Sequence, residues 1–175
     1  KRGWQLIRVL EDEEYVRDNA VLTARGAILA AKEEEQTSFQ DQQILVIGYG
    51  RIGKALTRLL REEGAFVTVA ARRVESRLEA GETSVSIQDL PQALPHMHMI
   101  FNTVPAQILE KEELALIPQS ALVMELASAP YGFDLALARE MGKNARLESG
   151  IPGRYFPREA AETLLRCIER KVGHE

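Results

Sequence analysis

The chain has 175 residues, which is enough for one well-packed domain and too few for two complete ones. Its formal net charge is −4 and its acidic and basic residues are interleaved, so the sequence predicts no nucleic-acid or membrane partner. The apolar runs are shorter than a bilayer requires, and the first residues lack the apolar stretch of a signal peptide. We therefore expect a soluble, cytoplasmic protein.

The cysteine content of the chain also supports a cytoplasmic location. Cys167 is the single cysteine, which excludes an internal disulfide and fits a reducing environment. It lies among apolar residues in a run with helical spacing, 160–172, so we interpret it as a small buried hydrophobe and not as a nucleophile. We find no cluster with metal-ligand spacing and expect no bound metal.

The N-terminal part differs from the rest of the chain. Residues 4–10 predict a short strand, an acidic stretch follows at 11–14, and a helix is expected from about Asn19 to Glu35. A strand without a sheet of its own suggests that residues 1–19 are the tail and linker of a preceding domain, with the main domain at 20–175, whose class the glycine-rich segment within it indicates. The alternative is an ordinary N-terminal extension of the same sheet. Because the first residue is not methionine, we expect the chain to be a fragment.

The most informative segment is ILVIGYGRIGKAL, at 44–56, where an aliphatic strand leads into a Gly-x-Gly-x-x-Gly loop and then a helix. This is the dinucleotide-binding fingerprint in its required context. Gly48 is expected to make the turn, Gly50 to let the backbone approach a pyrophosphate, and Gly53 to let the helix pack closely. The amides of Arg51 and Ile52 would point at the phosphates, at the positive end of the helix dipole.

Strand and helix patterns alternate from residue 40 onward, which predicts parallel strands joined by right-handed crossovers. The expected class is therefore an α/β, doubly wound Rossmann fold with a mostly parallel six-stranded sheet in the order 3-2-1-4-5-6. The strands are predicted at 44–47, 66–71, 85–87, 99–103, 121–126 and 145–148, and the helices between and after them at 54–63, 74–79, 108–116, 133–141 and 158–171.

The end of the second predicted strand indicates which dinucleotide is bound. NAD-binding folds place an acidic residue roughly twenty residues after the first glycine, where it binds the adenine ribose. Here the strand runs into Arg72 and Arg73 instead. A guanidinium can hold a 2′-phosphate that a carboxylate would repel, so the sequence favours NADP over NAD, with Arg72 the stronger candidate. The alternative is that both arginines are merely solvated.

Ligands in open α/β sheets lie outside the carboxyl ends of the strands, so the later loops should face the nicotinamide. The loop at 102–105 offers a hydroxyl and a rigid turn, the loop at 127–132 consists largely of small residues, and the loop at 150–153 is constrained by glycine and proline. Plain turn chemistry is the alternative for each. The complete set of predicted cofactor-binding residues is Gly48, Tyr49, Gly50, Arg51, Ile52, Gly53, Arg72, Arg73, Thr103, Val104, Pro105, Ala127 and Ser128.

A general acid or base is not evident. His96 and His98 stand at the start of the fourth strand, which is the wrong end of the sheet. Glu125 lies inside a strand, and Asp134 is explained as the start of a helix. No Ser/His/Asp or Cys/His set is present either. The catalytic residues are therefore unknown, and the chain has the pattern of the cofactor half of an enzyme.

With these residues identified, nearly the whole chain resembles the C-terminal nucleotide-binding domain of the dipicolinate synthase A-subunit family. The family's Thr-Ala-Glu-Gly-Ala-Ile helix start is matched by 23–28, with Arg25 in place of the usual glutamate. Its Asp-Leu-Ala-Ser-x-Pro-Gly-Gly-x-Asp segment is approached by 125–134, where Glu125 and Tyr131 depart from the pattern. Four further family motifs have counterparts in this chain. They are the glycine loop at 48–53, the Ala-Arg-Lys after the second strand at 71–73, the Asn-Thr-x-Pro at 102–105 and the Gly-Leu-Pro-Gly at 150–153.

The resemblance implies a nicotinamide-dependent oxidoreductase that works with a dipicolinate synthase B subunit. Together they would oxidise a dihydrodipicolinate-level intermediate to dipicolinate, the calcium-chelating acid of bacterial spores. It also implies that most substrate-handling residues lie outside this chain, which would then bind NADP(H) with little turnover alone.

Two other interpretations stay open. One is the cofactor domain of a shikimate-dehydrogenase-like or 2-hydroxyacid-dehydrogenase-like enzyme, and the other is a non-catalytic nucleotide-sensing module. The module would normally need an acid after the second strand, which Arg72 and Arg73 argue against. The sequence does not decide whether the chain forms a homo-oligomer.

Overall fold

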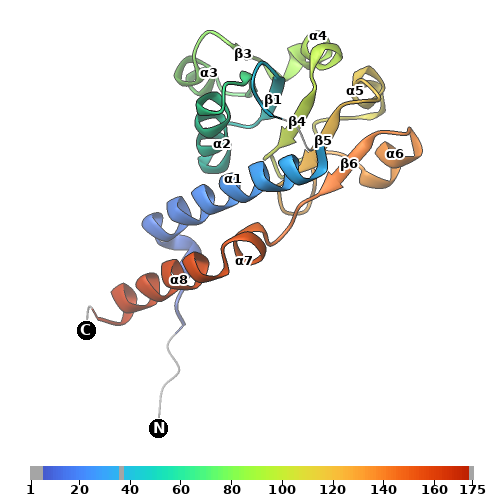
Figure 1. Cartoon of the computed structure of the whole chain (residues 1–175). Helices are drawn as coiled ribbons and strands as arrows, with labels where there is room; N and C mark the ends of the chain where they lie inside the picture. Colours follow the sequence, from blue (N-terminus) through green and yellow to red (C-terminus); the bar gives the residue numbers. More distant parts are fainter. Residues whose placement is uncertain (1–5, 36–37, 174–175) are drawn as a thin grey trace.

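The computed structural model describes residues 6–35 and 38–173. Its centre is a six-stranded, entirely parallel sheet with the strand order β3-β2-β1-β4-β5-β6, which confirms the predicted Rossmann topology (Figure 1). The order reverses between β1 and β4, and a ligand crevice is expected at this switch point. The strands are β1 (Gln43–Ile47), β2 (Phe66–Ala70), β3 (Ser84–Val85), β4 (Met99–Asn102), β5 (Leu122–Glu125) and β6 (Asn144–Leu147).

The central strands are apolar on both faces because helices cover both. In β1, Ile44 and Val46 pack on one side, and Leu45 and Ile47 pack on the other. This is the alternation that a strand with period two imposes. The first side is covered by α1 (Glu13–Glu35), α2 (Arg51–Glu62) and α7 (Ile151–Tyr155), and the second by α4 (Leu90–Ala93), α5 (Lys111–Leu116) and α6 (Leu135–Glu140).

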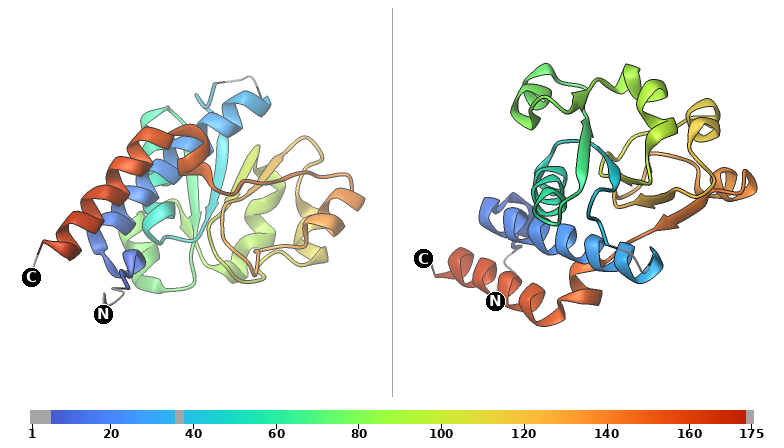
Figure 2. Two further views of the ribbon diagram at one scale, coloured as in Figure 1. Left: turned by 90° about the horizontal axis from the view of Figure 1, so that it is seen from below. Right: turned by 45° about the horizontal axis from the view of Figure 1, so that its top comes forward.

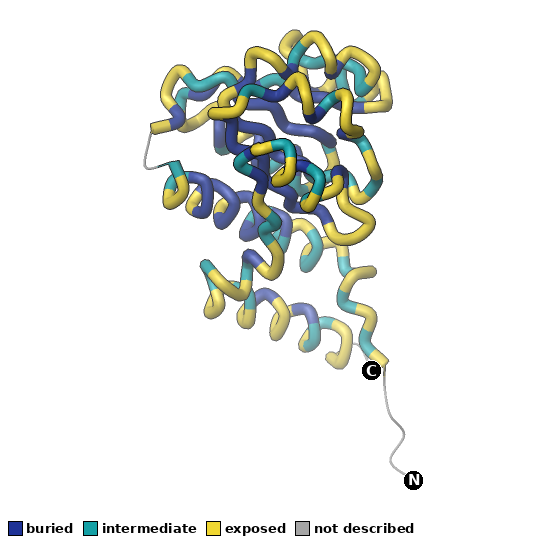
Figure 3. The backbone as a smooth tube through the Cα atoms, turned by 90° about the vertical axis from the view of Figure 1, so that its right-hand side faces the viewer, coloured by how far each residue is buried: buried dark blue, intermediate teal, exposed yellow. Residues whose placement is uncertain are grey.

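The remaining helices lie at the periphery. Helix α3 (Val74–Ala80) follows β2, and α8 (Pro157–Val172) runs beside α1 (Figure 2). Short 3-10 turns occur at Val9–Glu11, Ile87–Asp89 and Leu94–His96. The buried residues concentrate in the sheet and α1, whereas α8 is mostly exposed and buries only Thr163 and Cys167 (Figure 3). The prediction that Cys167 is a buried hydrophobe is confirmed.

The N-terminal prediction is wrong over the described residues. Residues 6–8 have no regular structure and Val9–Glu11 forms a 3-10 turn, so no strand forms there; positions 4 and 5 lie outside the described residues. Helix α1 begins at Glu13, not at Asn19, because Asp12 accepts a hydrogen bond from the amide of Tyr15 at 2.8 Å. Within the acidic stretch, Asp12 thus caps the helix and Glu13 and Glu14 form its first turn, where carboxylates interact favourably with the helix dipole.

A second correction concerns residues 150–153, which were expected to form a loop. Gly150 adopts φ +61° and ends the connection from β6, after which Ile151 opens the short helix α7, with Pro152 in its first turn. Gly26 of α1 lets α7 approach closely, because a Cβ at Gly26 would overlap the Ile151 side chain. Since proline is well accommodated in a first helical turn, this sequence starts a helix instead of closing a loop.

Two other helices begin a few residues away from their predicted starts, and in each case a capping residue explains the difference. Helix α5 starts at Lys111, three residues later than expected, because Glu110 and Glu113 form a reciprocal capping box. Helix α6 starts after Asp134, whose carboxylate accepts from the amides of Ala136 and Leu137. No helix in the described part of the chain is long and apolar enough to cross a membrane.

Candidate functional site

The glycine loop connects β1 to α2 at the switch point of the sheet. Gly48 has φ +97°, and a Cβ there would lie 2.5 Å from Thr103 Oγ1 and 2.7 Å from Val104 Cγ2. A Cβ at Gly53 would overlap the carbonyl oxygen of Gly48. Both glycines are therefore required by the fold itself, for the turn and for the close approach of the helix to the loop.

Gly50 differs from these two glycines, because no atom of the described residues would clash with a Cβ at its position. A Cβ at Gly50 would meet nothing within 4 Å, and its φ of −80° is open to any residue. It caps α2 without a side-chain hydrogen bond, and the amides of Arg51 and Ile52 make no backbone hydrogen bond among the described residues. An exposed glycine beside unpaired helix amides is the arrangement that lets a phosphate approach the backbone.

A cavity of about 490 Å³ lies on one side of this loop, at the ends of β1, β2 and β4. Arg72 and Arg73 line it and are both exposed, and neither forms an ion pair with a carboxylate in the described part of the chain. The other lining residues are largely small or apolar: Gly48, Tyr49, Gly50, Ala70, Ala71, Ser76, Ile87, Val104, Pro105, Ala106 and Ile108. This combination suits an aromatic ring and an anionic group.

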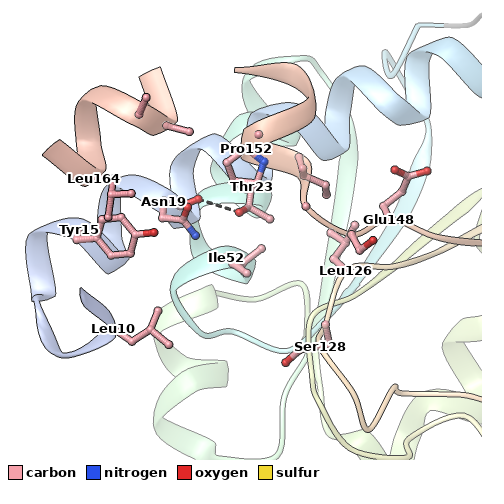
Figure 4. A pocket seen from close by; sticks show the side chains of 17 residues that line it. Leu10, Tyr15, Asn19, Thr23, Ile52, Leu126, Ser128, Glu148, Pro152 and Leu164 are labelled. Atoms are coloured by element: carbon pink, nitrogen blue, oxygen red, sulfur yellow. Dashed lines mark hydrogen bonds between the residues drawn. The ribbon is translucent and has the colours of Figure 1, made fainter. Parts of the chain in front are cut away.

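A larger cavity of about 750 Å³ lies on the other side, where β5 and β6 end beneath α1, α7 and α8 (Figure 4). Ala127 and Ser128 line it, together with Pro152 and Leu164. A third cavity of about 240 Å³, over the start of α2, shares Gly50 with the first and Ile52 with the second. The three cavities thus adjoin one another along the carboxyl ends of the strands, with the N-terminus of α2 at the middle, and we call them together the trough.

The loops after β4 and β5 are held by a buried polar network. The side-chain amide of Asn102 donates to both carboxylate oxygens of Glu125, at 2.8 and 3.0 Å, and to the carbonyl of Val104 at 2.9 Å. The same carboxylate accepts from the amides of Ala127 and Gly132, each at 2.8 Å. Because Val104 and Ala127 line the trough, this network fixes two of its walls.

Glu125 is almost fully buried, and desolvation by burial raises the pKa of its carboxyl above the ordinary value. The hydrogen bonds from Asn102, Gly132 and Ala127 oppose that rise but are outweighed. Glu125 faces its hydrogen-bond donors, and it is absent from the residues that line the trough. Its role is therefore to position the loops.

The structure brings all but one of the predicted site residues onto the wall of the trough. The exception is Gly53, which is buried behind the loop that it allows to form. Thr103 lines the central cavity, but its hydroxyl donates to the carbonyl of Ile47 at 2.9 Å, so only its oxygen lone pairs remain for a ligand. His98 accepts from the amide of Gln43 at the far end of the sheet.

Several trough residues were missed by sequence reasoning. Ser76 and Ile87 reach the arginine-lined cavity from α3 and the turn after β3, and Asn19 and Tyr15 reach the larger cavity from α1. Ser76 could have been found, since it lies in the first turn of the helix that directly follows Arg72 and Arg73. The α1 residues gave no such signal, because long-range packing of α1 on α2 places them here.

The fold and the trough together define a nucleotide-binding domain of the Rossmann class. Residues 8–144 match the family described as D-isomer specific 2-hydroxyacid dehydrogenase, NAD binding domain, and the chain belongs to that family. It is therefore a nucleotide-binding oxidoreductase domain, and the cofactor class of the family is a nicotinamide dinucleotide.

The chain is also similar to the A subunit of dipicolinate synthase. It is 27% identical to that protein from Bacillus subtilis (strain 168) over 169 residues, which are 95% of this chain and 57% of the relative. Crystal structures of the same dipicolinate synthase component from Bacillus halodurans and from Bacillus subtilis superpose with TM-scores of 0.90 and 0.91, at 29% and 27% identity. They cover 98% and 97% of this chain, which spans 60% and 58% of theirs.

The resemblance expected from the sequence motifs is thus confirmed, although the chain spans little more than half the length of these relatives. A transhydrogenase from Sinorhizobium meliloti superposes with a TM-score of 0.71 at 17% identity, over 90% of this chain and 56% of the transhydrogenase. That likeness shows the fold alone.

Proposed function

We propose that the trough binds a nicotinamide dinucleotide in an extended conformation. The adenosine half occupies the arginine-lined cavity, the pyrophosphate lies over the amides of Arg51 and Ile52, and the nicotinamide half reaches Ala127 and Ser128. The observation that carries the proposal is Gly50, whose missing side chain leaves open space beside unpaired amides where a phosphate would fit.

We further propose that the cofactor is NADP, with NAD as the alternative. The support is that Arg72 and Arg73 follow β2 where NAD-binding folds carry an acid, and that both are exposed at the cavity. A guanidinium can bind the 2′-phosphate through two parallel hydrogen bonds.

Calorimetric titration of NADPH and NADH tests this choice. Arg72→Ala should weaken NADPH binding by roughly tenfold or more, since hydrogen bonds to charged groups contribute about 1.5–3 kcal/mol, and should leave NADH binding nearly unchanged. Arg58→Ala, which removes an exposed arginine of α2 outside the trough, is the matched control and should change neither. Equal binding of both dinucleotides by the unmodified chain would contradict the NADP assignment.

For the reaction, we propose that this chain is the dinucleotide-binding part of an enzyme that oxidises a dihydrodipicolinate-level intermediate to dipicolinate during sporulation, together with a dipicolinate synthase B-type subunit. Similarity to the dipicolinate synthase A-subunit family over nearly the whole chain supports this. The bound nicotinamide would supply the hydride acceptor. The residues of this chain would bind the cofactor, orient its nicotinamide along the loops held by Asn102 and Glu125, and leave the rest of the larger cavity for the substrate.

We also propose that a companion domain precedes this one, because the chain spans only 57–60% of its dipicolinate synthase relatives. The residues that lead from it would be those before α1, which begins at Glu13, so the linker ends earlier than the expected boundary at residue 19. The larger cavity is open toward Leu10 and Leu164, which are 77% and 38% exposed. A companion domain on that side would complete the substrate site.

The isolated chain should therefore bind NADPH yet show little or no turnover. The experiment follows the formation of NADPH by absorbance, with NADP⁺ and freshly generated dihydrodipicolinate as the reactants, for the chain alone and for the full-length protein mixed with its B-type subunit. Activity restricted to the mixture supports the proposal. Full turnover by the chain alone would contradict the division of roles, and turnover of shikimate instead would contradict the substrate.

A further inference from the structure

Helix α1 contributes directly to the middle of the trough. Val16, Asn19, Ala20 and Thr23 form a stripe at helical spacing that faces the start of α2, and each lines the central or the larger cavity. The helix is held in this position by its packing on α2 and by an ion pair between Glu13 and Arg51 Nη2, at 2.7 Å. The start of α1, which was expected to belong to a linker, therefore forms part of a wall of the site.

Within this stripe, Asn19 is the polar residue whose side chain has hydrogen-bonding groups left free by the described part of the chain. The hydroxyl of Thr23 donates to the backbone carbonyl of Asn19 at 2.8 Å, so it is already used within the helix. The carboxamide of Asn19, in contrast, makes no hydrogen bond to any residue within 6–35 and 38–173. It is half-buried and lies between Tyr15 and Ile52 in the cavity (Figure 4).

The position of this carboxamide matters because Asn19 lines two of the three cavities. It shares the central cavity with Gly50, Arg51 and Ile52, and the larger cavity with Ser128. A dinucleotide that crosses the start of α2 and continues to Ser128 must pass Asn19 after its pyrophosphate. Asn19 is absent from the wall of the arginine-lined cavity.

We propose that Asn19 is a cofactor-binding residue, whose carboxamide hydrogen-bonds the pyrophosphate and ribose of the nicotinamide half while α2 binds the same pyrophosphate from the opposite side. An amide both donates and accepts, so it can serve a phosphate oxygen and a ribose hydroxyl. This inference rests on the proposed dinucleotide function, and it adds a residue outside the glycine loop to the site.

The test compares two ligands by calorimetry. NADPH contains both halves of the dinucleotide, whereas 2′,5′-ADP carries the adenosine half alone. Asn19→Ala should weaken NADPH binding about tenfold, the effect of losing one good hydrogen bond to a charged group, and change 2′,5′-ADP binding less than about twofold. Asn19→Asp, which keeps the side-chain shape, should weaken NADPH binding further, because its carboxylate repels the pyrophosphate.

Asn144→Ala, in β6 at the amino end of the sheet, is the matched control and should alter neither ligand. Thermal unfolding of each variant separates loss of contact from loss of fold. Equal weakening of both ligands, or unchanged NADPH binding in Asn19→Ala, would overturn the role of Asn19 while leaving the proposed function intact. Failure of the unmodified chain to bind NADPH would instead overturn the proposed function, and the inference with it.

Discussion

The carboxamide of Asn102, at the end of β4, donates to both oxygens of the Glu125 carboxylate, at the end of the neighbouring strand β5. The two residues are paired in register across the sheet, so this contact joins the loops that follow the two strands. Neither side chain lines the trough, yet both determine where its walls lie.

The first prediction concerns this pair and Gly132. Asn102→Ala should lower the free energy of unfolding by about 1–3 kcal/mol, because it removes a donor from a buried carboxylate. Gly132→Ala should also destabilise, since its Cβ would overlap the Asn102 side chain. In the Asn102→Ala background that obstacle is gone, so the second substitution should cost less. Urea unfolding of the four proteins measures the coupling, and strictly additive effects would contradict this packing of Gly132 against Asn102.

The second prediction is a pH dependence of stability. Burial raises the pKa of Glu125 in the folded protein above its ordinary value of 4.5, so folding favours the protonated form. The stabilising contribution is complete below the unfolded pKa and is lost as the pH rises through the folded one. The unfolding free energy of the unmodified protein, minus that of Glu125→Gln, should therefore fall as the pH increases from about 4.5. A difference that grows with pH would show that the amide donors outweigh burial.

A third prediction separates the glycines that serve the fold from the one assigned to the ligand. Gly53→Ala should destabilise by about 1–3 kcal/mol, because its Cβ would meet a backbone oxygen that cannot move aside. Gly50→Ala should change stability by less than about 1 kcal/mol, since its Cβ enters open space. It should nevertheless abolish most NADPH binding. Thermal unfolding and calorimetry of both variants check this, and a Gly50→Ala protein that binds NADPH normally would count against the phosphate position.

Much of this fold could be predicted because its signals are local. Aliphatic runs such as 44–47 and the glycine pattern after them determine a strand, a turn and a helix within a few residues of one another. The N-terminal error arose where two local signals competed, since the apolar residues before Asp12 suggested a strand while the acidic residues after it began α1. The charges of Glu13 and Glu14 suit a first helical turn, so the helix begins there.

The trough was harder to predict in full because part of it depends on contacts between distant segments. Arg72 and Ser128 follow strands directly, so sheet topology alone places them at the carboxyl edge. Asn19 reaches the trough only because α1 packs across α2, which no local pattern reveals. The same holds for Asn102 and Glu125, whose pairing depends on the register between β4 and β5.

The central claim is that a dinucleotide binds along the trough, and an NMR titration tests it most directly. NADPH is added to the ¹⁵N-labelled 19.6 kDa chain, and the chemical shift of each backbone amide is followed. We expect the largest shifts at Gly50, Arg51 and Ile52, with further shifts near Arg72 and Ser128. Helix α5, which covers the face of the sheet opposite to α1 and α2, should change little. No shifts at saturating NADPH, or shifts confined to residues outside the trough, would contradict the claim.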